Sequence, residues 1–232
     1  MTNTRSNKYQ WLIPWLGFLL LVPSVIINIL LFQKSKLVQG TYLVTQVKDG
    51  DTFETQDRSI IRFDTLDAPE LQFCGGEQAK KALEKLVLGK RVRLDSQARD
   101  PNGRQIASVW SGNTWIDAEL IKTGWVAYSS STVDKDHILQ NLDYANRDAK
   151  KGIYSSLCTQ TENPDNPKCL IKGNIVGEWT NKGQKIYHYP GCIQYKTTMV
   201  ERYLGEEWFC TEKEAKAAGY IKSGGCKSPI KK

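Results

Sequence analysis

A long uncharged apolar stretch near the amino terminus, residues 11–32, constrains this chain more than any other feature. It reads WLIPWLGFLLLVPSVIINILLF. As a helix it would be about 33 Å long, which is enough to cross the hydrocarbon core of a bilayer. Its two prolines are tolerable in a membrane helix, and Trp11 and Trp15 suit the headgroup level. The sequence therefore predicts a transmembrane segment at 11–32, preceded by a cytoplasmic tail at 1–10.

The main alternative for this segment is a cleaved secretory signal. A signal would have a shorter apolar core followed by a small-x-small cleavage site, whereas Leu-Phe-Gln-Lys follows here. We therefore expect an uncleaved signal anchor. Basic residues flank both of its ends, so the positive-inside rule barely decides the orientation. All six cysteines lie beyond the segment and suit an oxidising compartment, so we expect residues 38 onward outside the cytoplasm.

Beyond a linker at 33–40, the patterns are those of short strands with a few helices. They predict strands at 41–47, 52–55, 59–63, 91–94 and 105–110, and helices at 79–88, 117–123 and 134–151. The last helix is expected to bury Ile138, Leu142, Ala145 and Ala149 on one face. Several short strands, one helix between the third and fourth, and terminal helices favour an α+β fold built on a small Greek-key barrel of the OB type.

Acidic and basic residues gather at the turns and strand ends of this predicted barrel. They are Asp51, Arg62, Asp67, Glu70 and Arg104, within VKDGDT, IIRFDTLDAPE and DPNGRQIASV. The Asp-Gly of the first segment indicates a tight turn with positive φ. Each of these side chains alone is more often a turn cap or a solvated charge. The chain carries 32 basic and 25 acidic residues, so its net charge of +7 suits an anionic partner such as nucleic acid.

Taken together, the five residues form a coherent set for cleaving a phosphodiester bond. Two aspartates offer hard oxygen ligands of the kind that Ca²⁺ takes. Two arginines can each place a planar fork of N–H donors on phosphate oxygens. The remaining glutamate can orient or deprotonate a water molecule.

The segment at 41–158 resembles the thermonuclease family, also called staphylococcal-nuclease homologues. The matching motifs are V-x-DGDT, R-x-x-x-x-DAPE, D-x-x-GR and the KKGIY that ends the last helix. The resemblance implies a five-stranded OB barrel with three helices, and Ca²⁺-dependent endonucleolytic cleavage of DNA and RNA that leaves 3′-phosphates. It makes DNA or RNA the expected partner, together with the membrane through residues 11–32, and implies no obligate protein partner.

The resemblance also implies roles for individual residues. Asp51 and Asp67 are the calcium carboxylates, and the backbone carbonyl of Ala68 is a further ligand. Glu70 positions or activates the attacking water. Arg62 and Arg104 hold the phosphate, and Arg104 also assists the leaving oxygen.

Two positions depart from the family pattern. Asn102 stands where a well-known member has an aromatic residue near the nucleotide, which leaves nucleotide preference open. Asp64 adds an acid close to the site, where it would either face solvent or point toward the metal.

The six cysteines divide between the barrel and the region after it. Cys74 and Cys158 lie where exported relatives carry cysteines, and the resemblance implies a disulfide between them; two free thiols are the alternative. A polar segment with two prolines at 159–168 predicts a linker to a small cysteine-rich module at 169–232. Its cysteines are Cys169, Cys192, Cys210 and Cys226. They allow three disulfide pairings, or zinc binding with His188, which the lack of a C-x-x-C pair disfavours.

Two functions compete with a nuclease. A non-catalytic OB module could bind single strands without cutting them, but it would have no need for three acids beside its arginines. A structural or protein-interaction domain at the membrane would not be stabilised by Ca²⁺.

Overall fold

The computed structural model describes residues 26, 41–129, 134–177 and 183–226. The expected tail at 1–10, the expected anchor at 11–32 (apart from Ile26) and the expected linker at 33–40 lie outside the described residues. Among the residues that are described, no helix is long and apolar enough to cross a membrane. Residues 42–232 group into one compact unit.

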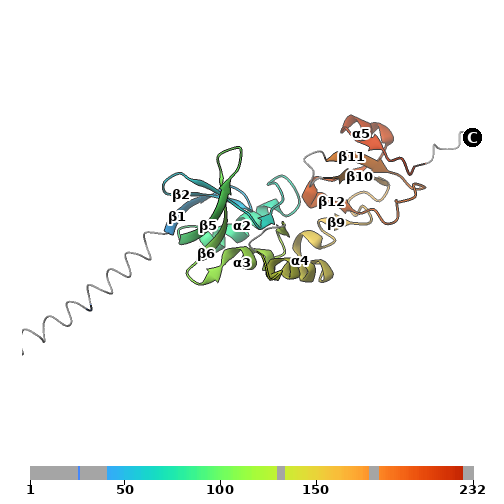
Figure 1. The fold of residues 1–232 in the computed structure, drawn as a ribbon. Helices are drawn as coiled ribbons and strands as arrows, with labels where there is room; N and C mark the ends of the chain where they lie inside the picture. Colours follow the sequence, from blue (N-terminus) through green and yellow to red (C-terminus); the bar gives the residue numbers. More distant parts are fainter. Residues whose placement is uncertain (1–25, 27–40, 130–133, 178–182, 227–232) are drawn as a thin grey trace, which may run out of the picture. The chain divides into compact units, whose positions relative to one another are not determined.

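Five strands form a closed barrel at the start of this unit (Figure 1). They are β1 (Thr41–Val47), β2 (Thr52–Thr55), β3 (Ile60–Phe63), β5 (Arg91–Arg99) and β6 (Gln105–Ser111). The strand order is β3-β2-β1-β5-β6, and β3 also pairs with β6, which closes the sheet. The β3–β2, β2–β1 and β5–β6 pairs are antiparallel, and the β3–β6 pair is parallel. A short strand, β7 (Thr114–Trp115), folds back on β6. The expected five-stranded α+β barrel is thus confirmed.

Three helices pack on the barrel. They are α2 (Gly76–Val87), α3 (Ile116–Lys122) and α4 (Ile138–Asp148). Phe53 and Ile61 of the barrel share one core with Leu83 and Leu120 of the helices, all fully buried. Asp117 in α3 is buried as well, and it accepts hydrogen bonds from the Val109 amide and the Thr65 hydroxyl (2.8 and 2.6 Å). These bonds anchor α3 to the barrel.

The structure corrects three of the sequence-based boundaries. Helix α2 begins at residue 76 rather than 79, and β5 continues to residue 99 rather than 94. Helix α4 begins at residue 138 rather than 134, because the buried Asp134 carboxylate accepts the amides of Leu139 and Gln140 and so stands before the helix.

The buried face of α4 also differs from the expectation. Ile138, Ala145 and Ala149 are exposed, whereas Leu139, Asp143 and Asn146 are buried. Leu142 is partly buried against the core, as expected. Two of the three buried side chains are polar, so hydrophobic spacing identified only part of this face. Buried polar groups need hydrogen-bond partners. The Asn146 amide donates to the Ile121 carbonyl at 2.7 Å, and Asp143 accepts from the Tyr154 hydroxyl at the same distance.

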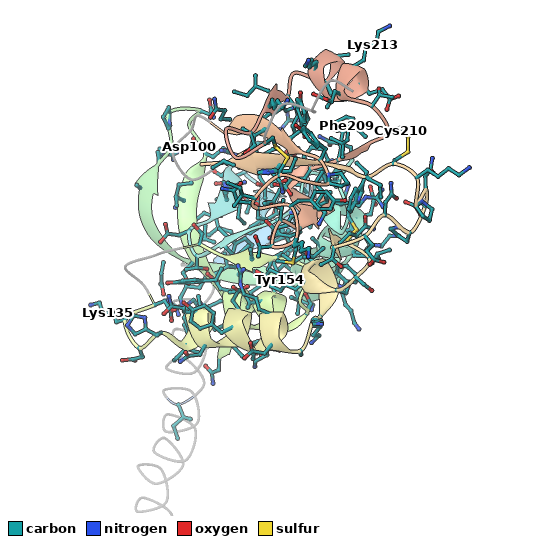
Figure 2. All side chains as sticks on the ribbon, turned by 90° about the vertical axis from the view of Figure 1, so that its right-hand side faces the viewer. Asp100, Lys135, Tyr154, Phe209, Cys210 and Lys213 are labelled. Carbon is teal, nitrogen blue, oxygen red and sulfur yellow. A yellow bond between two sulfur atoms is a disulfide. The ribbon has the colours of Figure 1, made fainter. Side chains whose placement is uncertain are left out.

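The C-terminal module contains a second, smaller sheet of order β13-β10-β11-β14. Its strands are β10 (Ile171–Val176), β11 (Gln184–His188), β13 (Trp208–Phe209) and β14 (Ile221–Lys222), with helix α5 (Glu212–Ala217) beside them. Tyr187, Phe209 and Tyr220 form its core, while Lys213 points outward from α5 (Figure 2). The Thr211 hydroxyl accepts the Glu214 amide at 3.2 Å, as expected for a capping box.

The segment at 159–168, for which we predicted a linker, starts with a strand. Strand β9 (Thr159–Gln160) pairs antiparallel with β12 (Val200–Glu201) of the module. The Trp208 indole also donates to the Gln160 side chain at 2.8 Å. These contacts join the module to the end of the barrel domain.

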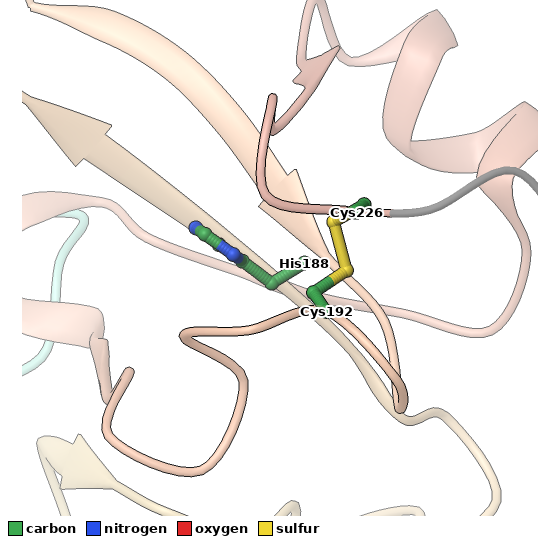
Figure 3. A group of neighbouring side chains, drawn as sticks. All are labelled: His188, Cys192 and Cys226. Carbon is green, nitrogen blue, oxygen red and sulfur yellow. A yellow bond between two sulfur atoms is a disulfide. The ribbon is translucent and has the colours of Figure 1, made fainter.

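All six cysteines form disulfides, and the structure selects the pairing that the sequence left open. Cys74 pairs with Cys158 as expected, and the module holds Cys169–Cys210 and Cys192–Cys226. His188 lies next to the last of these (Figure 3). Because the Cys192 and Cys226 sulfurs are bonded to each other, they are not thiolate ligands, and the zinc alternative is not supported.

Candidate active site

The hairpin of β2 and β3 brings the first two predicted site residues together. Thr52 pairs with Arg62 across the strands, so Asp51 comes to lie beside Arg62. The side chain of Asp51 is buried, and the Thr52 hydroxyl donates to its Oδ1 at 2.8 Å. Arg62 donates from Nη1 to the same oxygen at 2.6 Å.

Gly50, in the turn before Asp51, was expected to adopt a positive φ, but it is required for a different reason. Its φ is not positive. Instead, a Cβ at this position would lie 2.6 Å from the Cβ of Ala68 and would also collide with Ala79 of α2. Glycine is therefore required because the turn, the segment around Ala68 and α2 approach each other closely.

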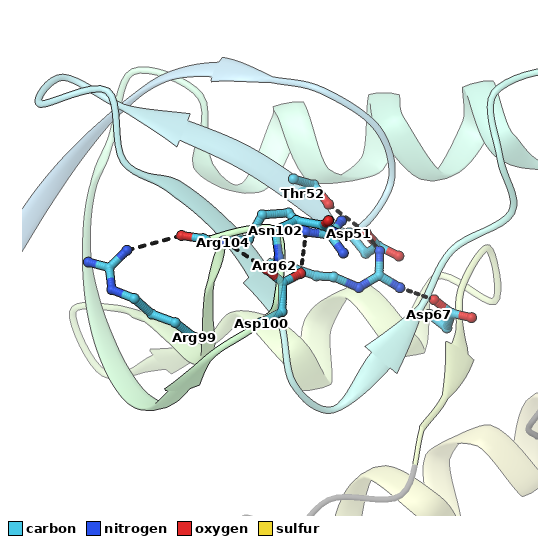
Figure 4. A network of polar contacts seen from close by, with 9 residues as sticks. Asp51, Thr52, Arg62, Asp67, Arg99, Asp100, Asn102 and Arg104 are labelled. Atoms are coloured by element: carbon cyan, nitrogen blue, oxygen red, sulfur yellow. Dashed lines mark hydrogen bonds and ion pairs between the residues drawn. The ribbon is translucent and has the colours of Figure 1, made fainter. Parts of the chain in front are cut away.

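Asp67 reaches the same place from another strand. It ends β4 (Leu66–Asp67), which pairs antiparallel with β8 (Ala127–Tyr128). Arg62 bridges the two aspartates, with Nη1 on Asp51 and Nη2 on Asp67 (Figure 4). The Ala68 amide donates to the second oxygen of Asp51 at 2.9 Å. Both predicted metal carboxylates and Ala68 are thus brought together.

Burial is the largest influence on the pKa values of Asp51 and Arg62. Desolvation raises the pKa of Asp51 above its ordinary value, although Arg62 acts in the opposite direction. Burial would also lower the pKa of Arg62, but the neighbouring carboxylates of Asp51 and Asp67 raise it. The positive charge of Arg62 thus opposes the effect of burial on Asp51 without cancelling it.

The donor set fits a hard divalent cation. One oxygen from each aspartate contacts the same guanidinium, through its two Nη nitrogens, so both carboxylates face one positively charged group. The Ala68 backbone is fixed beside them by its hydrogen bond to Asp51. Carboxylate and carbonyl oxygens are the ligands that Ca²⁺ and Mg²⁺ prefer.

Arg104 is held by a tight turn that precedes β6. Its amide and its Nε both donate to the Asp100 carboxylate, at 2.9 and 2.6 Å. Gln105, the next residue, pairs with Ile61, which neighbours Arg62 in β3. Within the described chain, the two terminal Nη groups of Arg104 have no partner. They are therefore available to an anion, whereas those of Arg62 are engaged by carboxylates.

The two positions that depart from the family pattern lie outside the strands, Asn102 in the turn before β6 and Asp64 directly after β3. The Asn102 amide donates to the Asp100 carboxylate at 3.0 Å, in the turn that holds Arg104. The Asp64 amide donates to the Ala107 carbonyl at 3.1 Å, at the end of β3. These bonds fix the backbone at both positions.

Glu70 lies with Asp67 in a cavity of about 280 Å³. The lining residues are Asp67, Ala68, Pro69, Glu70, Phe73, Ala127, Arg147, Glu201, Tyr203 and Leu204. The Glu70 side chain is exposed and makes no hydrogen bond or ion pair with the described residues. Its carboxylate is therefore free to contact water. Asp51, Arg62 and Arg104 do not line this cavity.

Sequence reasoning missed the cavity residues that come from α4 and the module, namely Arg147, Glu201, Tyr203 and Leu204. No motif links positions so far apart in the chain. The one available signal was the pair of cysteines, since a bridge between Cys74 and Cys158 brings the end of the barrel domain to the loop after Glu70.

The module also contacts this loop directly. The Cys74 amide donates to the Arg202 carbonyl at 3.4 Å, and the Arg202 amide donates to the Cys158 carbonyl at 2.7 Å. Gly205 has φ +81°, and a Cβ there would lie 2.5 Å from the ring of Phe73. The loop that carries Glu70 is thus packed against a glycine of the module.

Gly205→Ala is expected to destabilise the protein by about 1–3 kcal/mol, because it adds backbone strain and forces Phe73 to move. Gly219→Ala is the matched control, since Gly219 has φ +86° but open space around the Cβ position. Denaturant unfolding measures both. The loss of unfolding free energy in Gly205→Ala beyond that in Gly219→Ala measures the contribution of the Phe73 contact. Equal losses would mean that the loop does not depend on this contact.

The barrel domain is similar to a known protein family. The family model described as staphylococcal nuclease homologue matches residues 60–156. The thermonuclease of Staphylococcus intermedius is 33% identical over 135 residues, covering 52% of this chain and 79% of that protein. A "Probable staphylococcal-like nuclease" of Oryza sativa subsp. japonica is 29% identical over 133 residues, 57% of this chain. An "Uncharacterized endonuclease" of Haemophilus influenzae is 30% identical over 109 residues, 45% of this chain and 61% of that protein. The chain spans only 34% of the rice relative's length.

Proposed function

The chain belongs to the staphylococcal nuclease homologues, and on that basis we propose that it is a nuclease that hydrolyses phosphodiester bonds of DNA or RNA. One observation carries the proposal: Asp51 and Asp67 both pair with the guanidinium of Arg62, and Glu70, with a free carboxylate, lines the same cavity as Asp67. Fixed charges aimed at the place where charge develops are the largest contributors to this kind of catalysis.

Each residue has a chemical task in the proposed reaction. Glu70 orients or deprotonates the attacking water from the wall of the cavity. The free Nη groups of Arg104 bind the phosphate and stabilise its developing negative charge. Arg62 has two tasks, because it holds the phosphate and also neutralises Asp51 and Asp67. The products carry a 3′-phosphate, as the family resemblance implies.

We propose Ca²⁺ as the cofactor, held by Asp51, Asp67 and the Ala68 carbonyl. When bound, it would supply positive charge to the phosphate oxygens. The hydrogen bond from the Ala68 amide to Asp51 supports this assignment, since it holds Ala68 beside the Asp51 carboxylate. Arg62 occupies the position between both aspartates, so cation binding requires its Nη groups to give up these partners.

The full chain is expected to cut plasmid DNA or RNA with Ca²⁺ and to lose that activity in EDTA. Calcium at 100 times its dissociation constant should also stabilise the fold by about 2.7 kcal/mol, because it binds the native state alone. Thermal melts with and without Ca²⁺ measure this shift. Asp67→Asn is the control, and it should remove most of the calcium-dependent shift. Full activity in chelator would overturn the cofactor assignment.

The alternative function is nucleic-acid binding without cleavage. It predicts that oligonucleotides bind and that intact strands are recovered after long incubation with Ca²⁺. The acids in the site favour the enzyme, because Asp51, Asp67 and Glu70 would repel a phosphate backbone in the absence of a cation.

We also propose that residues 11–32 anchor the protein in a membrane and that the nuclease domain lies outside the cytoplasm. The uncharged stretch supports the anchor. The complete pairing of six cysteines supports an oxidising compartment. Fractionation of cells, followed by protease treatment of intact cells, tests both statements; a cytosolic or protease-protected domain would contradict them.

A further inference from the structure

Arg147 is an unusual member of the cavity beside Glu70. Among the described residues that line the cavity it is the one cation, and it comes from α4 rather than from any of the three motifs. We propose that Arg147 binds a phosphate of the nucleic-acid strand adjacent to the phosphate that is cut, in a subsite whose far wall is built by the C-terminal module. This inference rests on the proposed nuclease function.

Two contacts hold the guanidinium of Arg147 in place. Its Nε donates to Asp143 at 2.8 Å, and its central carbon lies 4.3 Å from the centre of the Tyr154 ring. Asp143 is itself fixed, because it is buried and accepts the Tyr154 hydroxyl at 2.7 Å. An arginine held in this way loses little further freedom when it binds a ligand.

The two Nη groups of this guanidinium are open. Neither Nη group has a hydrogen-bond partner among the described residues, and the side chain is 44% exposed. Two parallel N–H donors on a fixed plane match two oxygens of a phosphate. Asp143 thus neutralises part of the charge and orients the fork without occupying it.

The C-terminal module completes the subsite. Tyr203 packs edge-on against Tyr154, with ring centres 6.0 Å apart, and its hydroxyl donates to Glu201 at 2.9 Å. Tyr203 and Glu201 line the same cavity as Glu70 and Arg147. The module therefore supports Arg147 through Tyr203 and Tyr154, and it forms a wall beside the reacting group.

The charges of the cavity indicate where a strand would run. Asp67, Glu70 and Glu201 are acidic and would repel a phosphate unless a cation is bound, so the cut phosphate is expected at the metal end. Arg147 offers the next attractive position. The volume of about 280 Å³ is at the small end of ligand pockets, roughly 300–1,000 Å³, which suits one nucleotide unit between the two positions.

The test is oligonucleotide binding to the full chain carrying Glu70→Gln, which slows cutting of the strand during the measurement. Adding Arg147→Ala should weaken binding of a single-stranded pentanucleotide by roughly 10- to 100-fold, as expected for loss of a charge-assisted bidentate contact. The ratio should be clearly smaller for a dinucleotide, which has a single phosphate. The slope of log affinity against log salt should fall by about 0.7, the value for one phosphate contact on a single strand.

Arg93→Ala is the matched control. Arg93 also pairs with an aspartate, Asp95, and lies over an aromatic ring, with its central carbon 5.3 Å from the centre of Trp110. It does not line the cavity. This variant should change neither the affinity ratio nor the salt slope. Arg147→Lys, which keeps the charge but not the fork, should recover the salt slope and only part of the affinity.

Three outcomes would overturn the subsite. They are an unchanged pentanucleotide affinity in Arg147→Ala, an equal loss for the dinucleotide, and an equal effect in Arg93→Ala. A purely structural role of Arg147 would lower the melting temperature without changing the salt slope. The binding measurement needs no cleavage, so it is judged apart from the proposed function, which fails separately if the unmodified chain does not cut nucleic acid.

Discussion

Glu70→Gln is expected to lower the cleavage rate about 10²- to 10⁴-fold, the range usually lost with a general acid or base. Glutamine keeps the shape of the side chain but cannot accept a proton from water. The fold should be unaffected, because the Glu70 side chain is exposed and makes no hydrogen bond or ion pair with the described residues. The measurement is the initial rate on plasmid DNA with saturating Ca²⁺, together with a thermal melt.

Glu77→Gln is the control for this variant. Glu77 is an exposed carboxylate in the first turn of α2, close in sequence to Glu70 but outside the cavity. It removes the same charge without touching the proposed site, so cleavage should stay near the rate of the unmodified chain. If Glu70→Gln cuts DNA at that rate as well, the proposed role of Glu70 is wrong. If both variants lose activity equally, the effect is one of overall charge.

The double variant Cys74→Ser, Cys158→Ser is expected to lose about 4 kcal/mol of stability. The two cysteines are 84 residues apart, and closing so long a loop removes much conformational entropy from the unfolded chain. For a domain of this size the loss corresponds to a melting temperature lower by about 8–16 °C. Activity should fall too, since this disulfide ties the loop after Glu70 to the end of the barrel domain.

Cys192→Ser, Cys226→Ser separates the two effects. This pair closes a loop of 34 residues inside the module, so its removal also costs stability but leaves the loop after Glu70 attached. At a temperature where both variants are folded, cleavage should be reduced only without Cys74–Cys158. An unchanged melting temperature in the Cys74 and Cys158 variant would contradict the stabilising role, and equal cleavage by both variants would contradict the positioning role.

Much of the fold could be predicted because its signals are local. The strands at 41–47 and 52–55 show the expected bounds, since alternation and turn residues act over a few positions. The site residues Asp51, Arg62 and Asp67 were identified from motifs whose spacing reflects one hairpin and the strand after it. Thr52 lies opposite Arg62 because the short turn between β2 and β3 sets the register of the two strands.

Other features depended on contacts between distant segments. Gly50 fits a close approach to Ala68 and α2, which no turn rule predicts. The buried face of α4 carries Asp143 because Tyr154 and Arg147 satisfy its carboxylate, so the hydrophobic pattern identified only Leu142 of that face.

The amino-acid sequence by itself determined the barrel, the family and the five residues of the three motifs. Local periodicity and turn preferences depend on residues that are close in sequence, so they can be predicted from the sequence alone. Only the tertiary structure decided which cysteines pair, which arginines keep free donors, and that Arg147 and Tyr203 share a cavity with Glu70. Those facts follow from burial and from tertiary contacts, because packing rather than sequence proximity selects the partner of a side chain.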